Sequence, residues 1–216
     1  EVVSVSVGQV RQSLMENYDA SGLYLQTRCA IAVAQRNLDA VRECLRQNTA
    51  FERVDPVSGT PLLMSACRDG DTTILTILLE DDDDIEVDQI CPVSGISALM
   101  ETVRTRNAQA AERLLSANAD PTITTSSGAE SAIKIAAEAL GNPDEVSEVM
   151  VVARVLAWHL VLVQEEWPEV KEREDAIVTL LEAGMDGKEV PVPPSMEVAA
   201  GTDTILLAAC RRGLIN

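Results

Sequence analysis

Apolar residues occur along most of the chain in pairs of short runs. In residues 62–79 the run LLMSAC is followed by a polar break and then by TILTILL. Small residues such as Ala66 and Cys67 lie in the first run, and a leucine pair ends the second. Apolar positions in runs of this length, bounded by polar breaks, predict short helices with one buried face. Each unit therefore reads as two short helices joined by a tight turn.

The helix pair recurs with a spacing of 36 residues. The tetrapeptide PVSG stands at 56–59 and again at 92–95, and the same shift aligns Met64 with Met100. Related stretches are found at 27–45, 126–139 and 201–213. One helix pair cannot cover its own apolar faces, so repeated pairs must stack. The sequence predicts an all-α solenoid of stacked antiparallel helix pairs, at a spacing of about 33–36 residues between 27 and 140.

These repeats resemble the ankyrin repeat family. GTPLLM, GISALM and DTILLAA are similar to the family's opening segment, and SANADPT at 116–122 and EAGMD at 182–186 are similar to its closing segment. The resemblance covers about residues 27–216 with one interruption, and it implies short turn or hairpin tips and a protein-binding role without cofactor. The register places Met64, Met100 and Leu207 where the family has a bracing histidine. We therefore expect no polar partner at Met64 and Met100.

The fourth unit is interrupted. NPDE at 142–145 predicts a helix start, with an Asn cap, Pro in the first turn and acids near the positive end of the dipole. We expect an extra-long apolar helix to about Gln164, and another helix over 168–183. EAGMD favours the later helix as the unit's second one, whereas the spacing favours the earlier. The predicted organisation is an N-terminal segment or capping half-repeat at 1–26, regular repeats at 27–140, the interrupted fourth repeat at 141–200, and a truncated fifth at 201–216.

Composition and charge narrow the possible partners. Apolar residues make up 46% of the chain and aromatic residues only 2%, which predicts a core of small aliphatic side chains. The formal charge of −18 argues against nucleic acid or an anionic membrane as a partner. The apolar run at 149–163 is shorter than a bilayer span and contains Arg154 and His159, so no transmembrane segment is expected.

Candidate chemistry is sparse. The five cysteines are scattered without a CxxC pair, which indicates an intracellular, cytoplasmic setting rather than a disulfide framework or zinc site. Cys91, next to a turn, is the cysteine expected to have an exposed thiol. His159 has no second histidine for a metal site or triad. The acidic run at 80–88 lacks the register of a calcium loop and is expected to be a solvated loop, or else a docking surface for a basic partner.

These observations predict a non-catalytic protein–protein interaction module rather than an enzyme. Partner contacts are expected at the turn tips and on the concave surface of the first helices. Arg68, Arg104 and Arg211 share one repeat position and predict a basic row there, although such cations also favour a helix dipole and pair with nearby acids. Trp158 is the expected anchor on the apolar helix. The predicted contact residues are Val57, Ser58, Thr60, Arg68, Val93, Ser94, Ile96, Arg104, Ser126, Ser127, Trp158 and Arg211.

Two other roles fit the same sequence. The apolar helix at 145–164 favours a structural subunit of a large multiprotein assembly. The chain could also be the regulatory ankyrin segment of a longer enzyme.

Overall fold

The structure, a computed structural model, describes residues 22–47, 53–68, 72–81, 85–141, 146–162 and 170–183. Helices account for most of these ranges, and extended backbone within them is limited to isolated bridges such as Val54 with Pro61. The helices are α2 (Gly22–Ala34), α3 (Leu38–Arg46), α4 (Leu62–Cys67), α5 (Thr73–Asp81), α6 (Ala98–Arg104), α7 (Ala108–Ser116), α8 (Ala132–Leu140), α9 (Val146–Leu162) and α10 (Val170–Glu182).

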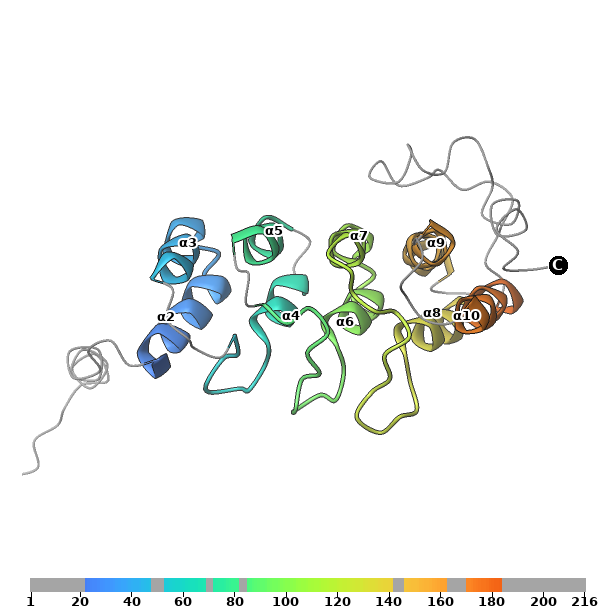
Figure 1. The fold of residues 1–216 in the computed structure, drawn as a ribbon, viewed down its shortest axis with the longest axis horizontal. Helices are drawn as coiled ribbons and strands as arrows, with labels where there is room; N and C mark the ends of the chain where they lie inside the picture. Colours follow the sequence, from blue (N-terminus) through green and yellow to red (C-terminus); the bar gives the residue numbers. More distant parts are fainter. Residues whose placement is uncertain are drawn as a thin grey trace, which may run out of the picture.

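The helices form two parallel rows (Figure 1). Helices α2, α4, α6 and α8 make one row, and α3, α5, α7 and α9 make the other. The first helices of successive units begin at Leu62, Ala98 and Ala132, which are 36 and 34 residues apart. The all-α solenoid of stacked helix pairs is therefore confirmed. Three loops project from the row of first helices, before α4, α6 and α8 (Figure 1).

The turn between the two helices of a unit is built in the same way at α2–α3 and α6–α7. Asn37 caps α3 by accepting a hydrogen bond from the backbone N–H of Ala40 at 3.1 Å, and Asn107 caps α7 through Ala110 at 3.0 Å. Such caps satisfy one of the N–H groups that a helix start leaves without an acceptor. Asn107 also donates from Nδ2 to the carbonyl of Cys67 at 3.3 Å, which ties this turn to the preceding repeat.

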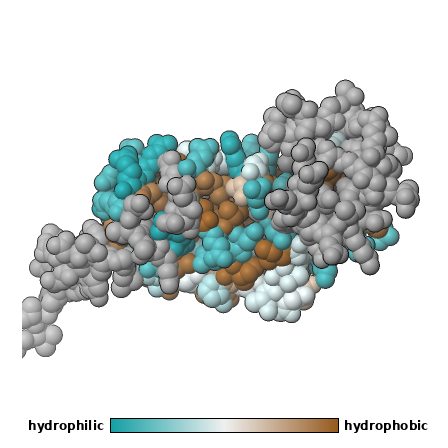
Figure 2. All heavy atoms as spheres, in the orientation of Figure 1, coloured by the Kyte–Doolittle hydropathy of each residue, from teal (hydrophilic) through white to brown (hydrophobic). Residues whose placement is uncertain are grey.

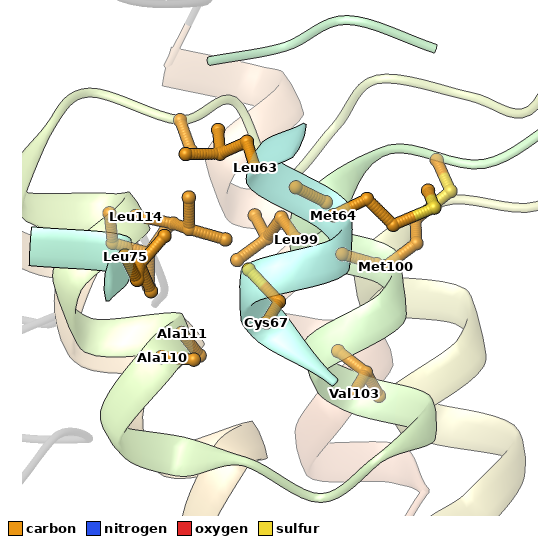
Figure 3. Close-up of a cluster of buried hydrophobic side chains, with 14 of the residues drawn as sticks. Leu63, Met64, Cys67, Leu75, Leu99, Met100, Val103, Ala110, Ala111 and Leu114 are labelled. Carbon is orange, nitrogen blue, oxygen red and sulfur yellow. The ribbon is translucent and has the colours of Figure 1, made fainter. Parts of the chain in front are cut away.

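Small side chains on the first helices allow the close approach of neighbouring units. Figure 3 shows Cys67 of α4 beside Leu99 and Val103 of α6, with Ala110 and Ala111 of α7 closing the cluster. All of these side chains are buried. Burying a leucine or valine stabilises the fold by about 1.5–3 kcal/mol. The stack is thus held by many such contacts between successive layers rather than by large aromatic anchors.

Met64 and Met100 occupy equivalent, fully buried places on α4 and α6. Ser94 Oγ donates a weak hydrogen bond to Met64 Sδ at 3.9 Å. The expectation that Met64 has no polar partner is therefore wrong. The reason is that the next projecting loop carries Ser94 within hydrogen-bond distance of the Met64 sulfur.

The fourth unit is completed by α9. This helix has 17 residues, against nine in α3, α5 and α7, and it packs on both α7 and α8. Helix α10 instead packs on α8 and α9, beside the row of first helices (Figure 1). Helix α9 therefore takes the place of the unit's second helix, as the repeat spacing favoured and the EAGMD segment did not. Position in the stack makes α10 resemble the first helix of a further unit.

Trp158 lies on α9 with none of its side chain exposed. The prediction that it anchors a partner is wrong, because the side chain is covered within this chain. Val152, Leu156 and Leu160 on the same helix are also buried, and among the described residues of α9 the large exposed apolar side chain is Val151, at 48%. Periodicity predicted apolar side chains around most of this helix, but it could not say that the chain itself would cover them.

Candidate protein-binding surface

The projecting loops before α4 and α6 share one turn geometry. In the first, Asp55 N–H donates to the carbonyl of Thr60 at 2.8 Å, and Gly59 N–H donates to the carbonyl of Asp55 at 2.7 Å. The second loop repeats both bonds, from Cys91 to Ile96 at 2.9 Å and from Gly95 to Cys91 at 2.7 Å. Both glycines are in the left-handed region, with φ of 67° and 71°. That conformation favours glycine, which explains why both copies of the tetrapeptide PVSG end in glycine.

In each loop, one side chain inside the turn accepts hydrogen bonds from N–H and O–H groups of the same turn. The Asp55 carboxylate accepts hydrogen bonds from the N–H of Val57 at 3.0 Å and from Ser58 Oγ at 2.7 Å. Cys91 holds the same place in the second loop. Burial acts to raise the pKa of the Cys91 thiol, but hydrogen bonds from Ser94 and from the backbone hold that pKa below its ordinary value. Cys91 is buried, so the prediction of an exposed thiol at this position is wrong.

Neighbouring loops touch one another at their tips. A β-carbon placed on Gly59 would lie 3.5 Å from Val93 Cγ2, and one on Gly95 would lie 2.6 Å from Ser126 Oγ. The N–H of Ser126 also donates to the carbonyl of Gly95 at 3.1 Å. The three loops therefore form one continuous edge instead of three independent projections.

Two valines stand at the end of this edge. Val57 is 90% exposed and Val93 is 74% exposed. Figure 2 shows apolar atoms reaching the surface on the side from which the loops project. Exposed serines lie beside the valines. We call the six exposed residues the tip surface: Val57, Ser58, Val93, Ser94, Ser126 and Ser127.

Two of the predicted tip residues do not belong to this surface. Thr60 and Ile96 are both buried. Each directly follows the glycine of its loop, at the point where the chain turns back toward its helix, and so their side chains point inward. Thr60 Oγ1 lies 3.0 Å from Ser58 Oγ, within hydrogen-bond distance inside the loop. The prediction that these two residues face a partner is wrong.

The predicted arginine row lies between repeats and pairs with acids. Arg68 Nε donates to Glu101 Oε1 at 2.7 Å, and Arg104 Nη2 lies 3.4 Å from Glu130 Oε2. Only 12% of the Glu101 side chain is exposed, whereas Arg68 is 51% exposed. Each pair joins one unit to the next. Both arginines thus pair with nearby acids, which was the alternative to a basic row that faces a partner. Arg211 lies outside the described residues.

Sequence reasoning missed an anchor at the end of the acidic run. Asp88 Oδ1 accepts a hydrogen bond from the N–H of Asp120, one unit further along, at 2.9 Å. Burial raises the pKa of the Asp88 carboxyl, while this hydrogen bond opposes the rise. The last acid of the run is therefore half-buried and joins two units, whereas the run as a whole was expected to be a solvated loop or a docking surface for a basic partner.

His159 and Cys67 behave as packed side chains. Burial lowers the pKa of His159 to about 4, and burial raises the pKa of the Cys67 thiol to about 12 with a smaller contribution from Glu101. In the described part of the chain, histidine, cysteine, aspartate and glutamate form no group that could hold a metal ion. None of the helices in that part is long and apolar enough to cross a membrane.

Comparison with known proteins agrees with this architecture. A sequence model of ankyrin repeats, in three copies, matches residues 27–148, which is more than half of the chain. A search of curated proteins finds no match. Among solved structures, one similar chain comes from the structure of a complex between a predatory endopeptidase from Bdellovibrio bacteriovorus and an immunity protein. It is 18% identical, with a TM-score of 0.45, over 86% of this chain and 92% of that one.

Proposed function

Because the chain belongs to the ankyrin repeat family, whose repeats are protein–protein interaction modules, we propose that it binds a protein partner through its tip surface. The binding surface continues from the tips onto the neighbouring faces of α4, α6 and α8. The observation that carries the proposal is the exposure of Val57 and Val93 at adjacent tips.

The valines are unfavourable where they stand unless something covers them. Exposed apolar patches at fixed positions mark interaction sites more often than isolated exposed side chains do. Burying a valine fully contributes about 1.5–3 kcal/mol. The hydroxyl oxygens of Ser58 and Ser94 beside the valines can accept hydrogen bonds from the backbone of a partner. Contact between successive tips adds rigidity, which reduces the entropy lost on binding.

The test compares two kinds of exposed valine. The variant V57D/V93D places charges on the tip surface, and V151D places one on α9, far from the tips along the chain. Neither set of side chains is buried, so both variants should fold as the wild type does, which circular dichroism checks. Each protein is used as bait in a lysate of its source cells, and bound proteins are quantified by isotope-labelled mass spectrometry.

We expect at least one protein to be enriched by the wild type and by V151D. Its recovery should fall at least about tenfold with V57D/V93D, since losing one buried valine already corresponds to a decade in affinity. Equal recovery by the double variant would contradict the proposal, as would an equal loss with V151D.

A further inference from the structure

The loops before α4 and α6 touch each other without the backbone hydrogen bond that joins the loops before α6 and α8. In the latter pair, Ser126 N–H donates to the carbonyl of Gly95 at 3.1 Å. Gly59 holds the place of Gly95 one loop earlier, with nearly the same φ. The Gly59 carbonyl, however, accepts no hydrogen bond from the part of the chain that the structure describes.

A proline explains the difference between the two pairs of loops. Cys91 and Thr125 begin equivalent turns, because each donates from its N–H to the carbonyl five residues further on. In this register Pro92 takes the place of Ser126. Proline has no N–H, so it cannot make the bond that the serine makes. Pro92 still lies beside Gly59, since a β-carbon placed on that glycine would be 3.8 Å from Pro92 Cγ.

The open carbonyl belongs to a residue that adjoins two exposed valines. Val57 precedes Gly59 by two residues, and Val93 Cγ2 would lie 3.5 Å from a β-carbon on Gly59. The two Pro-Val-Ser-Gly segments carry no charged side chain, although the chain has a formal charge of −18. We call Val57, Gly59, Pro92 and Val93 the junction. It offers apolar surface, one backbone acceptor and no charge.

We propose that the partner contacts the junction with an extended, uncharged segment whose backbone N–H donates to the Gly59 carbonyl. This inference rests on the proposed function and names the chemistry of the partner at the same surface. Helical N–H groups are used within their own helix, whereas an extended segment has free N–H groups and binds through main-chain hydrogen bonds. A charged side chain covering Val57 and Val93 would lose its hydration without gaining an opposite charge.

The first part of the test needs no partner. The variant P92S places the residue of the third loop in the second and supplies the missing N–H. We expect the ¹³C signal of the Gly59 carbonyl to move downfield in P92S, because the carbonyl then accepts a hydrogen bond, while the Gly95 carbonyl signal stays. P56S is the matched control, since it makes the same exchange in the first loop without facing Gly59 with an N–H. An unmoved Gly59 signal in P92S would overturn the inference.

The second part measures affinity by calorimetry. The binding probe is the protein that the wild type recovers and V57D/V93D does not, in purified form. P92S should weaken its binding about fivefold, the effect of one net hydrogen bond, and P56S less than about twofold. Raising NaCl from about 50 to about 500 mM should change the wild-type affinity less than about twofold, because the contact is uncharged. In the complex, the Gly59 carbonyl signal should move downfield and the Gly95 signal should stay.

The results separate this inference from the proposed function. Unchanged or tighter binding by P92S, an equal loss with P56S, or a steep fall of affinity with salt overturns the extended, uncharged segment. In each of those cases V57D/V93D still loses the partner, so binding at the tips stands. If the wild type recovers no protein, or V57D/V93D recovers it equally well, the proposed function fails and this inference fails with it.

Discussion

Replacing Gly95 by alanine tests whether the tips form one continuous edge. Gly59 is the matched control, because it holds the same place in the preceding loop and has nearly the same φ, 67° against 71°. The two sites differ in what a new methyl group would meet. At Gly59 it would lie at an ordinary contact distance of 3.5 Å from Val93 Cγ2, whereas at Gly95 it would lie 2.6 Å from Ser126 Oγ.

The two substitutions share one cost and differ in a second. Left-handed backbone at an alanine costs about 1–2 kcal/mol, and this applies equally to G59A and G95A. In G95A the Ser126 hydroxyl must also leave its position, which costs about 0.5–1.5 kcal/mol through an unfavourable rotamer or a small shift of the loop. We therefore expect G95A to lower the free energy of unfolding by about 2–3 kcal/mol and G59A by about 1–2 kcal/mol.

Urea denaturation followed by circular dichroism measures both values. The variant S126A supplies the decisive control, because without Oγ the nearest atom to the new methyl group is Ser126 Cβ at 3.8 Å. In the S126A background, G95A should cost no more than G59A. If G95A and G59A are equally destabilising in the wild-type background, or if S126A leaves the difference unchanged, the tips do not contact each other as described.

Three further predictions concern the interior and the contacts between repeats. W158A should lower the free energy of unfolding by about 3–5 kcal/mol, and W158F should cost less because it removes an indole N–H that has no partner in the described structure. His159 is the chain's single histidine, so its ring-proton NMR signal is assigned without ambiguity. That signal should stay at the chemical shift of the neutral form from pH 8 down to about 5, and a titration midpoint near pH 6.5 would contradict the burial of the ring. Because its folded-state pKa is depressed, its contribution to stability should be present above pH 6.5 and be lost as the pH falls toward 4, a trend that H159Q should weaken. A double-mutant cycle with R68Q and E101Q should give a coupling energy of about 0.5–1 kcal/mol, and a value of zero would deny this pair a role between repeats.

The fold could be predicted from the sequence because stacking imposes a strict requirement on composition. Ala66 and Cys67 must be small for neighbouring first helices to approach, and the leucine pair at 114–115 must fill the layer behind them. These requirements recur once per unit, so the period reveals them. The second helix of the fourth unit could not be identified from the sequence, because EAGMD is a local signal. The place of α9 is decided instead by its packing on α7 and α8.

The candidate surface was only partly predictable. The exposure of Val57 and Val93 could be predicted, because the middle residues of such a turn point outward. The burial of Thr60 and Ile96 could not, because it depends on how the chain returns to its helix directly after the glycine. The burial of Trp158 depends on which parts of the chain cover α9. The apolar periodicity of one helix carries no information about those neighbours.

Site-specific photocrosslinking tests the central claim, that a protein partner lies against the tip surface, most directly. A benzophenone amino acid is placed at Ser58 or Ser94, both exposed at the tips, and at Arg46, which is exposed on the outer helix α3. Irradiation in the source cells should give a crosslinked product of one defined mass from positions 58 and 94, and none of that mass from position 46. Crosslinking to that protein from position 46 alone, or with equal yield from all three positions, would contradict the assignment of partner binding to the tips.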